Sequence, residues 1–190
     1  MFRASVAAAV VVLVAGCAAP PALRWADPAA PPPRLAGFEV PPPPGRWYRV
    51  RGPEREVSYV RYGRAPGVVH AAQAVLLPLP FTYSTAEEFA AALARHRAGP
   101  LPDRFRPVRE HSEPATWRGL PCVRFAVTVR DLAAPRPAGS GPPVLEMAGF
   151  TCALGPGRAL ELRYSRRGTG QGMPLDRLVA SFVDGVRPVR

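Results

Sequence analysis

Seven stretches of the chain carry the alternating or continuous apolar pattern that is typical of β-strands. They are residues 46–50, 55–62, 68–78, 104–111, 120–131, 143–154 and 158–167. Two further segments, 84–100 and 173–185, show the apolar spacing of an amphipathic helix. The order is therefore three strands, a helix, four strands and a helix. Because strands and helices do not alternate one by one, we predict an α+β fold with a mostly antiparallel sheet of about six to seven strands and two helices.

Both predicted helices have recognisable ends and one apolar face. Ser84 is a candidate N-cap with Glu87 three residues later, as in a capping box. Phe89 and Leu93 then lie on the face expected to be buried. In the second helix the i, i+3, i+4, i+7 spacing predicts a buried stripe of Leu175, Leu178, Val179 and Phe182.

Two cysteines fall on strands that we expect to form a hairpin. Along residues 122–130 the odd positions are apolar, as in a half-buried strand. Matching the apolar faces of an antiparallel pair requires residue numbers with an even sum. A sum of 274 places Phe125 opposite Gly149 and also Cys122 opposite Cys152. We therefore predict a structural disulfide between Cys122 and Cys152 in an oxidising compartment. Two free thiols, one of them nucleophilic, are the alternative.

The strand that follows this hairpin alternates in the same way. We expect Leu160, Leu162 and Tyr164 to face the core. On this interpretation Glu161 and Arg163 point to solvent, where charged pairs contribute little to stability.

The start of the chain has the layout of a secretory signal peptide. Arg3 precedes an uncharged apolar run, and the small residues Ala15 and Gly16 precede Cys17. The run is too short to cross a bilayer as a helix. With the cysteine in this place, "VAGC" resembles the lipobox of bacterial lipoproteins. The resemblance implies cleavage before Cys17, a diacylglyceryl group on its thiol and a further acyl chain, such as palmitate, on its amino group. An ordinary signal peptide with a chance cysteine is the alternative.

Several acyl chains give stable membrane anchoring without a spanning segment. We therefore expect a lipid-anchored protein of the cell envelope whose membrane partner is reached through Cys17. In Gram-negative lipoproteins an Asp after the cysteine favours retention in the inner membrane. Ala18 in this position indicates the outer membrane, with the domain facing the periplasm.

Proline dominates the segment after Cys17, and apolar periodicity is absent from it. Such a composition is typical of an extended, semi-rigid linker. We predict a signal peptide over residues 1–16, a lipidated cysteine with a Pro/Ala-rich tether over 17–44, and a single α+β domain over 45–190. Residues 18–44 are expected to lack stable tertiary contacts, apart from docking of Phe38 or Val40.

The formal net charge of +11 comes entirely from arginine, because the chain contains no lysine. Asparagine and isoleucine are absent too, which indicates a GC-rich coding sequence rather than selection for a basic surface. The arginines are scattered, without the runs that typify nucleic-acid contacts. We therefore expect no nucleic-acid partner.

Few residues carry the pattern of a catalytic or metal site. His70, His96 and His111 have no metal-ligand spacing, so neither a metal nor a cofactor is predicted. The glycine-rich segment 168–172 lacks the lysine of a phosphate loop. Its simpler interpretation is a connection into the last helix.

Two features remain as candidate binding elements. One is the long loop 131–143, since loops of this length are often functional. The other is the pair Arg166 and Arg167 at a strand end, where two guanidinium groups could hold a carboxylate or phosphate. A solvated strand end is the alternative for this pair.

The order of elements resembles the Mog1/PsbP-like fold. The stretches that carry the resemblance are "HAAQAVLLP", "TAEEFAAAL", the four later strands with "ELRYS", and "LVASF" in the last helix. Members of this family act as assembly or accessory factors and share no catalytic set, so the resemblance implies binding. We expect a non-enzymatic envelope lipoprotein that binds an envelope protein or a cell-wall partner. The alternative is an envelope hydrolase that acts on cell-wall polymer.

Overall fold

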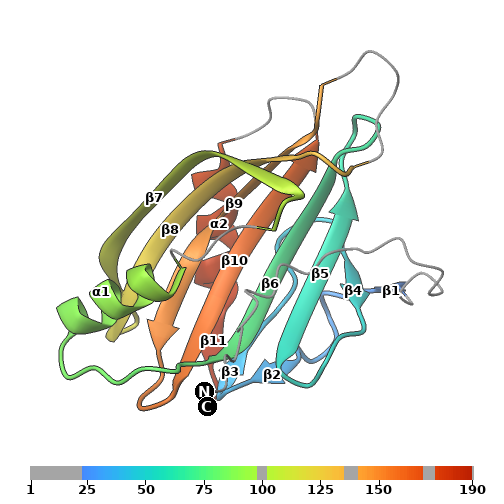
Figure 1. Ribbon diagram of the computed structural model, residues 1–190. Helices are drawn as coiled ribbons and strands as arrows, with labels where there is room; N and C mark the ends of the chain where they lie inside the picture. The colour runs from blue at the N-terminus through green and yellow to red at the C-terminus, as the bar shows by residue number, and fades with distance from the viewer. Residues whose placement is uncertain (1–22, 98–101, 135–140, 169–173, 190) are drawn as a thin grey trace.

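The structure, a computed structural model, is built on one large antiparallel sheet (Figure 1). The residues it describes are 23–97, 102–134, 141–168 and 174–189. The eight strands of this sheet, in spatial order, are β1 (Leu23–Trp25), β4 (Tyr48–Val50), β5 (Glu56–Tyr62), β6 (Val69–Pro78), β10 (Arg158–Gly168), β9 (Val144–Ala153), β8 (Leu120–Asp131) and β7 (Phe105–Trp117). The helices are α1 (Ala86–Arg97) and α2 (Leu175–Gly185). The predicted α+β class and mostly antiparallel sheet are confirmed.

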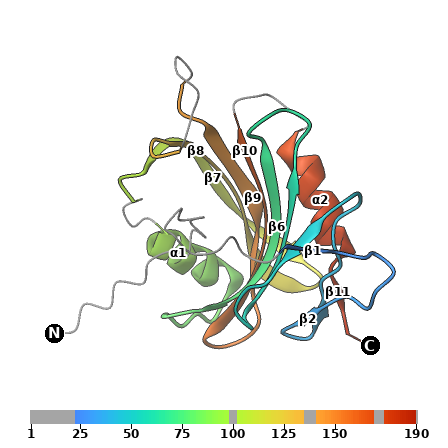
Figure 2. The same ribbon diagram turned by 90° about the vertical axis from the view of Figure 1, so that its right-hand side faces the viewer.

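The two helices cover opposite faces of the sheet (Figure 2). Phe89 and Leu93 of α1 are buried against a cluster that includes Val123. This side is called the α1 face, and it carries the odd-numbered residues of β8, β9 and β10. The even-numbered residues of these strands, such as Cys152 and Leu160, pack against α2 on the α2 face. The central strands are therefore covered on both sides.

A second, small sheet packs on the α2 face. Its strands, in spatial order, are β11 (Arg187–Pro188), β3 (Phe38–Glu39) and β2 (Arg34–Leu35). Leu35, Val40 and Val186 beside these strands belong to the same core cluster as α2. The last described residues of the chain are thus joined to a segment near its beginning.

The prediction of a tether over residues 17–44 is wrong for residues 23–44. Leu23 lies opposite Val50 in the pairing of β1 with β4, and Leu35 is buried at 5 % exposure. The docking that the prediction allowed for Val40 is present, with this residue at 0 % exposure. The prolines of this segment leave too few apolar positions to form a periodic pattern, yet short strands need only a few backbone hydrogen bonds. The domain therefore includes residues 23–44 and does not begin at residue 45. Cys17 and the predicted signal peptide lie outside the described residues.

The expected number of six to seven strands is too low for the same reason. The seven strands predicted from the sequence are all present, and β1 adds an eighth. The small sheet was not expected, because two of its strands lie in the proline-rich segment and β11 has only two residues.

The predicted register of the cysteine hairpin is confirmed. Cys122 lies opposite Cys152, and Phe125 lies opposite Gly149. The two cysteines form a disulfide with their Cα atoms 4.0 Å apart. Gly149 fits a close approach of strands, since a Cβ atom there would lie 2.0 Å from the carbonyl oxygen of Leu162. Both cysteines are buried on the α2 face.

The helix predictions hold with one correction at the start of α1. The amide of Glu88 donates to the hydroxyl of Thr85, and Glu88 in turn accepts from the amide of Ser84. The N-cap is therefore Thr85 rather than Ser84, one residue later than predicted, with Glu88 in place of Glu87. In α2, Val179 and Phe182 are buried as predicted, whereas Leu175 and Leu178 are only partly buried and Val183, outside the predicted stripe, is buried.

Candidate functional site

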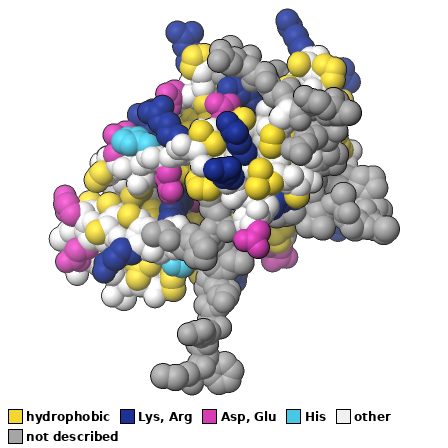
Figure 3. Space-filling view, turned by 45° about the horizontal axis from the view of Figure 1, so that its top comes forward, with side chains coloured by type: hydrophobic (Ala, Val, Ile, Leu, Met, Phe, Trp, Pro, Cys, Tyr) yellow, Lys and Arg dark blue, Asp and Glu magenta, His cyan; other side chains and the backbone are white. Residues whose placement is uncertain are grey.

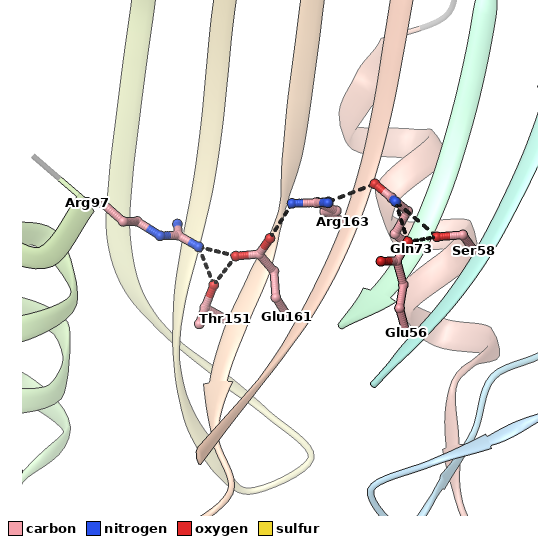
Figure 4. A network of polar contacts seen from close by, with 7 residues as sticks. All are labelled: Glu56, Ser58, Gln73, Arg97, Thr151, Glu161 and Arg163. Atoms are coloured by element: carbon pink, nitrogen blue, oxygen red, sulfur yellow. Dashed lines mark hydrogen bonds and ion pairs between the residues drawn. The ribbon is translucent and has the colours of Figure 1, made fainter. Parts of the chain in front are cut away.

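A strip of polar side chains crosses the α1 face at the middle of the sheet (Figure 4). It begins at the end of α1 and runs over β9, β10, β6 and β5. Its members, called the polar strip, are Arg97, Thr151, Glu161, Arg163, Gln73, Ser58 and Glu56. The alternation of each strand brings these residues to one face, and the register β9–β10–β6–β5 aligns them in neighbouring rows.

Glu161 is the centre of the polar strip. One of its carboxylate oxygens accepts hydrogen bonds from Arg97 and, at 3.1 Å, from Thr151. Its other oxygen accepts from Arg163 Nη1 at 3.0 Å. The guanidinium of Arg97 also stacks over the ring of Phe125, 4.2 Å from its centroid. The carboxylate is therefore held by three donors from three different elements.

The other half of the strip is joined through an amide. Arg163 Nε donates to Gln73 Oε1 at 2.8 Å. Gln73 Nε2 donates to Glu56 and to Ser58, each at 2.9 Å. Ser58 also donates to Glu56. Within the polar strip, the negative charges of Glu56 and Glu161 thus equal in number the positive charges of Arg163 and of Arg97, which comes from α1.

The prediction that Glu161 and Arg163 face solvent is wrong. Glu161 is 6 % exposed, and the side chain of Arg163 is 13 % exposed. The alternation along β10 indicates correctly that Glu161 and Arg163 point to the other face of the sheet from Leu160 and Leu162. Alternation cannot show that the α1 face is also covered. It is covered because α1 packs there and its Arg97 reaches Glu161. Among the described residues, no buried side-chain nitrogen or oxygen lacks a partner. With its oxygens occupied, Glu161 is placed for structure rather than for proton transfer.

A second polar cluster lies on the α2 face around the ring of Tyr164. The hydroxyl of Tyr164 lies 3.0 Å from Nδ1 of His70 and accepts from Arg61 Nη2 at 3.1 Å. Tyr164 also packs edge-on against Trp47, and Arg61 stacks over the Trp47 ring at 4.7 Å. Since the Tyr164 hydroxyl is buried, its proton needs an acceptor, and Nδ1 of neutral His70 provides one.

The charges around this cluster keep His70 neutral. Burial lowers the pKa of His70 to about 4, and the positive charges of Arg61 and Arg166 act in the same direction. Burial also raises the pKa of Tyr164, against the opposing effect of Arg61. The imidazole therefore acts at neutral pH as a hydrogen-bond acceptor for Tyr164.

We expect acidification to destabilise the domain through His70. The folded pKa of about 4 is below the ordinary value of about 6.5, so the unfolded chain takes up this proton first. The contribution of neutral His70 to the free energy of unfolding is complete above pH 6.5 and is lost as the pH falls toward 4. Between pH 7.5 and 5, allowing for solvent screening of a partly exposed ring, the expected loss is about 1 kcal/mol.

Chemical denaturation at pH 7.5 and pH 5 measures this effect. His70→Gln should remove the pH-dependent loss, while the exposed His96→Gln should retain it. Equal pH dependence in the wild type and in His70→Gln would contradict the assignment.

Arg166 and Arg167 do not converge on one point. They are consecutive in β10, so their side chains leave opposite faces of the sheet. Arg166 donates from Nε to Glu146 Oε2 at 2.8 Å on the α2 face. Arg167 Nη2 lies 3.1 Å from Asp131 Oδ2 on the α1 face. Neither interpretation from the sequence, a paired anion site or a solvated strand end, describes these residues. Each arginine instead forms a separate ion pair with a carboxylate of the protein.

The loop 131–143 is anchored at its start by Asp131, which is 1 % exposed. Asp131 accepts two hydrogen bonds from Arg104, at 2.7 and 2.8 Å. Burial acts to raise the pKa of Asp131, but the hydrogen bonds from Arg104 and the charges of Arg167 and Arg104 outweigh it and hold this pKa below its ordinary value. The centre of the loop, residues 135–140, lies outside the described residues.

A basic hollow lies beside the β1 edge of the sheet. Its volume is about 510 Å³, and four arginines line it: Arg24, Arg34, Arg49 and Arg51. This group is called the arginine hollow. Arg24 and Arg49 come from directly opposed positions of β1 and β4. Glu54 and Glu56 also line the hollow. Sequence reasoning missed it because Arg24 and Arg34 lie in the segment assigned to a tether.

A smaller hollow of about 340 Å³ lies between strands β7 to β9 and the start of α2. Part of its charge is paired internally, since Arg124 lies 3.4 Å from Glu113 and 2.9 Å from Asp176. Over the parts of the chain that the structure describes, no group of His, Cys, Asp and Glu residues could hold a metal ion. Within those same parts, neither helix has the length and hydropathy needed to cross a membrane.

Comparison with known proteins adds no relative. No protein-family model matches the chain, and neither a curated protein nor a solved structure matches it significantly.

Proposed function

We propose that this protein is a lipid-anchored lipoprotein of the cell envelope, with a binding or accessory role rather than an enzymatic one. The observation that carries the proposal is the position of the folded domain relative to Cys17. Only residues 18–22 separate this cysteine, which ends the lipobox-like stretch, from β1. A folded domain that begins directly after a lipidated cysteine is held at the membrane surface.

The two polar clusters support a binding role. The carboxylate of Glu161 is occupied by Arg97, Thr151 and Arg163, and Nδ1 of His70 is occupied by Tyr164. These contacts hold the sheet as a rigid platform. The proposed Mog1/PsbP-like topology would fit this role, since β4, β5 and β6 precede α1 and four strands, β7 to β10, lie between α1 and α2, while β1, β2, β3 and β11 are additional to the expected order. The proposed location is the outer membrane, with an envelope protein or a cell-wall polymer as partner.

The anchor is tested by the variant Cys17→Ser in a bacterial host that processes lipoproteins. The wild-type protein is expected to incorporate labelled palmitate and to fractionate with membranes, because its acyl chains insert into the bilayer. Cys17→Ser should incorporate no label and should remain unprocessed or become soluble. Labelling, membrane fractionation and the mass of the mature N-terminus measure the outcome.

The double variant Cys122→Ser/Cys152→Ser is the matched control, because it removes cysteines without touching the lipobox. It is expected to keep the palmitate label. Incorporation of label into Cys17→Ser, or absence of label from the wild type, would contradict the anchor. Recovery of a partner from native membranes with the lipidated protein then tests the accessory role.

A further inference from the structure

We propose that the arginine hollow and the β1 edge bind the phosphate headgroups of anionic phospholipids. This inference rests on the proposed function, since it assigns a second contact to the membrane that Cys17 would reach. The domain would then lie against the bilayer in a fixed orientation rather than swing on its anchor.

The first argument is the unbalanced charge of the hollow. Directly opposed residues of antiparallel strands have Cβ atoms about 5 Å apart, and like charges in this position destabilise the pair. Arg24 and Arg49 are such a pair. Among the described residues, no ion pair joins Arg24, Arg49 or Arg51 to a carboxylate, while Arg34 lies 3.7 Å from Glu39. An anion between the guanidinium groups would relieve the repulsion.

The acidic residues of the hollow do not neutralise it. Glu56 accepts from Gln73 and Ser58 in the polar strip. Glu54 is exposed and forms no ion pair with the four arginines. The four arginines of the hollow are exposed and available to a ligand, whereas the more buried arginines elsewhere are matched with carboxylates: Arg97 with Glu161, Arg104 with Asp131 and Arg166 with Glu146. Figure 3 shows basic side chains interspersed with acidic and apolar ones over the face it presents.

The second argument is the apolar and aromatic character of the same edge. Leu23 and Trp25 are 39 % and 48 % exposed, on the side of β1 opposite to Arg24. Trp25 contacts the Tyr48 ring edge-on with centroids 6.2 Å apart, and the guanidinium of Arg46 stacks over Trp25. Exposed tryptophan and tyrosine beside arginine are typical of residues at the level of lipid headgroups.

The third argument is distance. Cys17 and Leu23 are six residues apart, which a fully extended chain spans with at most about 20 Å. β1 is an edge strand of the sheet, so no other strand of the main sheet separates it from the surface. A lipidated Cys17 would hold this edge within reach of the phosphate layer. Each arginine near an anionic surface adds about 1 kcal/mol of attraction.

The test measures binding of the chain 18–190, which contains the whole described domain and carries no acyl chain. The probes are phosphatidylcholine vesicles with and without phosphatidylglycerol. We expect binding only to vesicles that contain phosphatidylglycerol. Arg24→Gln/Arg49→Gln should weaken it at least about tenfold. Since Trp47 and Trp117 are buried, a blue shift of tryptophan fluorescence on binding would report Trp25.

The matched control is Arg106→Gln/Arg109→Gln, which removes the same charge from exposed positions of β7 at the opposite edge of the sheet. It should weaken binding less than about threefold. Equal weakening by both variants, or none by the first, would overturn the proposal. Thermal unfolding checks that each variant is folded, and Arg34→Gln/Arg51→Gln serves as a second variant of the hollow with the same expected loss.

Inorganic phosphate is titrated alone to separate a free anion from a headgroup. Saturable phosphate binding without vesicle binding would overturn the lipid assignment. Palmitate labelling of Cys17 without vesicle binding would overturn this inference and leave the proposed function standing. Vesicle binding without labelling would reject the anchor while retaining the headgroup site.

Discussion

Replacing Cys122 and Cys152 together by alanine is expected to lower the free energy of unfolding by about 3 to 4 kcal/mol. The two residues are 30 positions apart, so their disulfide closes a long loop in the unfolded chain and reduces its conformational entropy. Alanine avoids placing hydroxyl groups in the buried position on the α2 face. For a domain of this size the melting temperature should fall by roughly 6 to 14 °C.

Thermal and urea denaturation under non-reducing conditions measure this loss. Reduction of the wild-type protein should reproduce the effect, and the alanine variant should show no further change on reduction. An alanine variant as stable as the oxidised wild type would contradict the expected contribution. Alkylatable thiols at both Cys122 and Cys152 in the unreduced protein would contradict the disulfide as well.

The second large effect is expected from Glu161→Gln. This variant removes the negative charge that Arg97 and Arg163 share, and it leaves the partly buried guanidinium group of Arg97 without this counter-ion. Removing one partner of a buried ion pair costs about 3 kcal/mol or more. The same denaturation measurements apply.

Glu113→Gln is the matched control for this prediction. Glu113 also pairs with an arginine on the sheet, Arg124, but both side chains are about half exposed, at 46 % and 45 %. Exposed pairs contribute less than about 1 kcal/mol. If both glutamine variants were equally stable, the polar strip would have no special role in holding the sheet.

The alternation of apolar residues was sufficient to predict most of the sheet. The register of β8 and β9 follows from two constraints that agree, the apolar faces and the positions of Cys122 and Cys152. The two helices follow from apolar spacing and end signals. In each case the pattern is local or joins neighbouring strands, so no knowledge of the rest of the fold was needed.

The features that were missed depend on contacts between distant segments. Glu161 is buried because Arg97 reaches it from α1, which no alternation within β10 can reveal. β1 and β3 are held by β4 and β11, and their own two or three residues carry no periodic signal. The arginine hollow combines Arg24 and Arg34 with Arg49 and Arg51, two groups that lie in segments we had assigned to different parts of the protein.

The pairing of β11 with β3 has a consequence for the order of events in biosynthesis. Arg187 lies opposite Glu39, and Val186 is fully buried in the same core as Val40. The segment around β3 therefore has no complete packing surface until β11, which lies 148 residues later in the chain, is available. Contacts this distant in sequence form slowly. A chain with this connectivity completes the packing of β3 only after β11 has left the ribosome, so this part of the fold forms late relative to the hairpins of the main sheet.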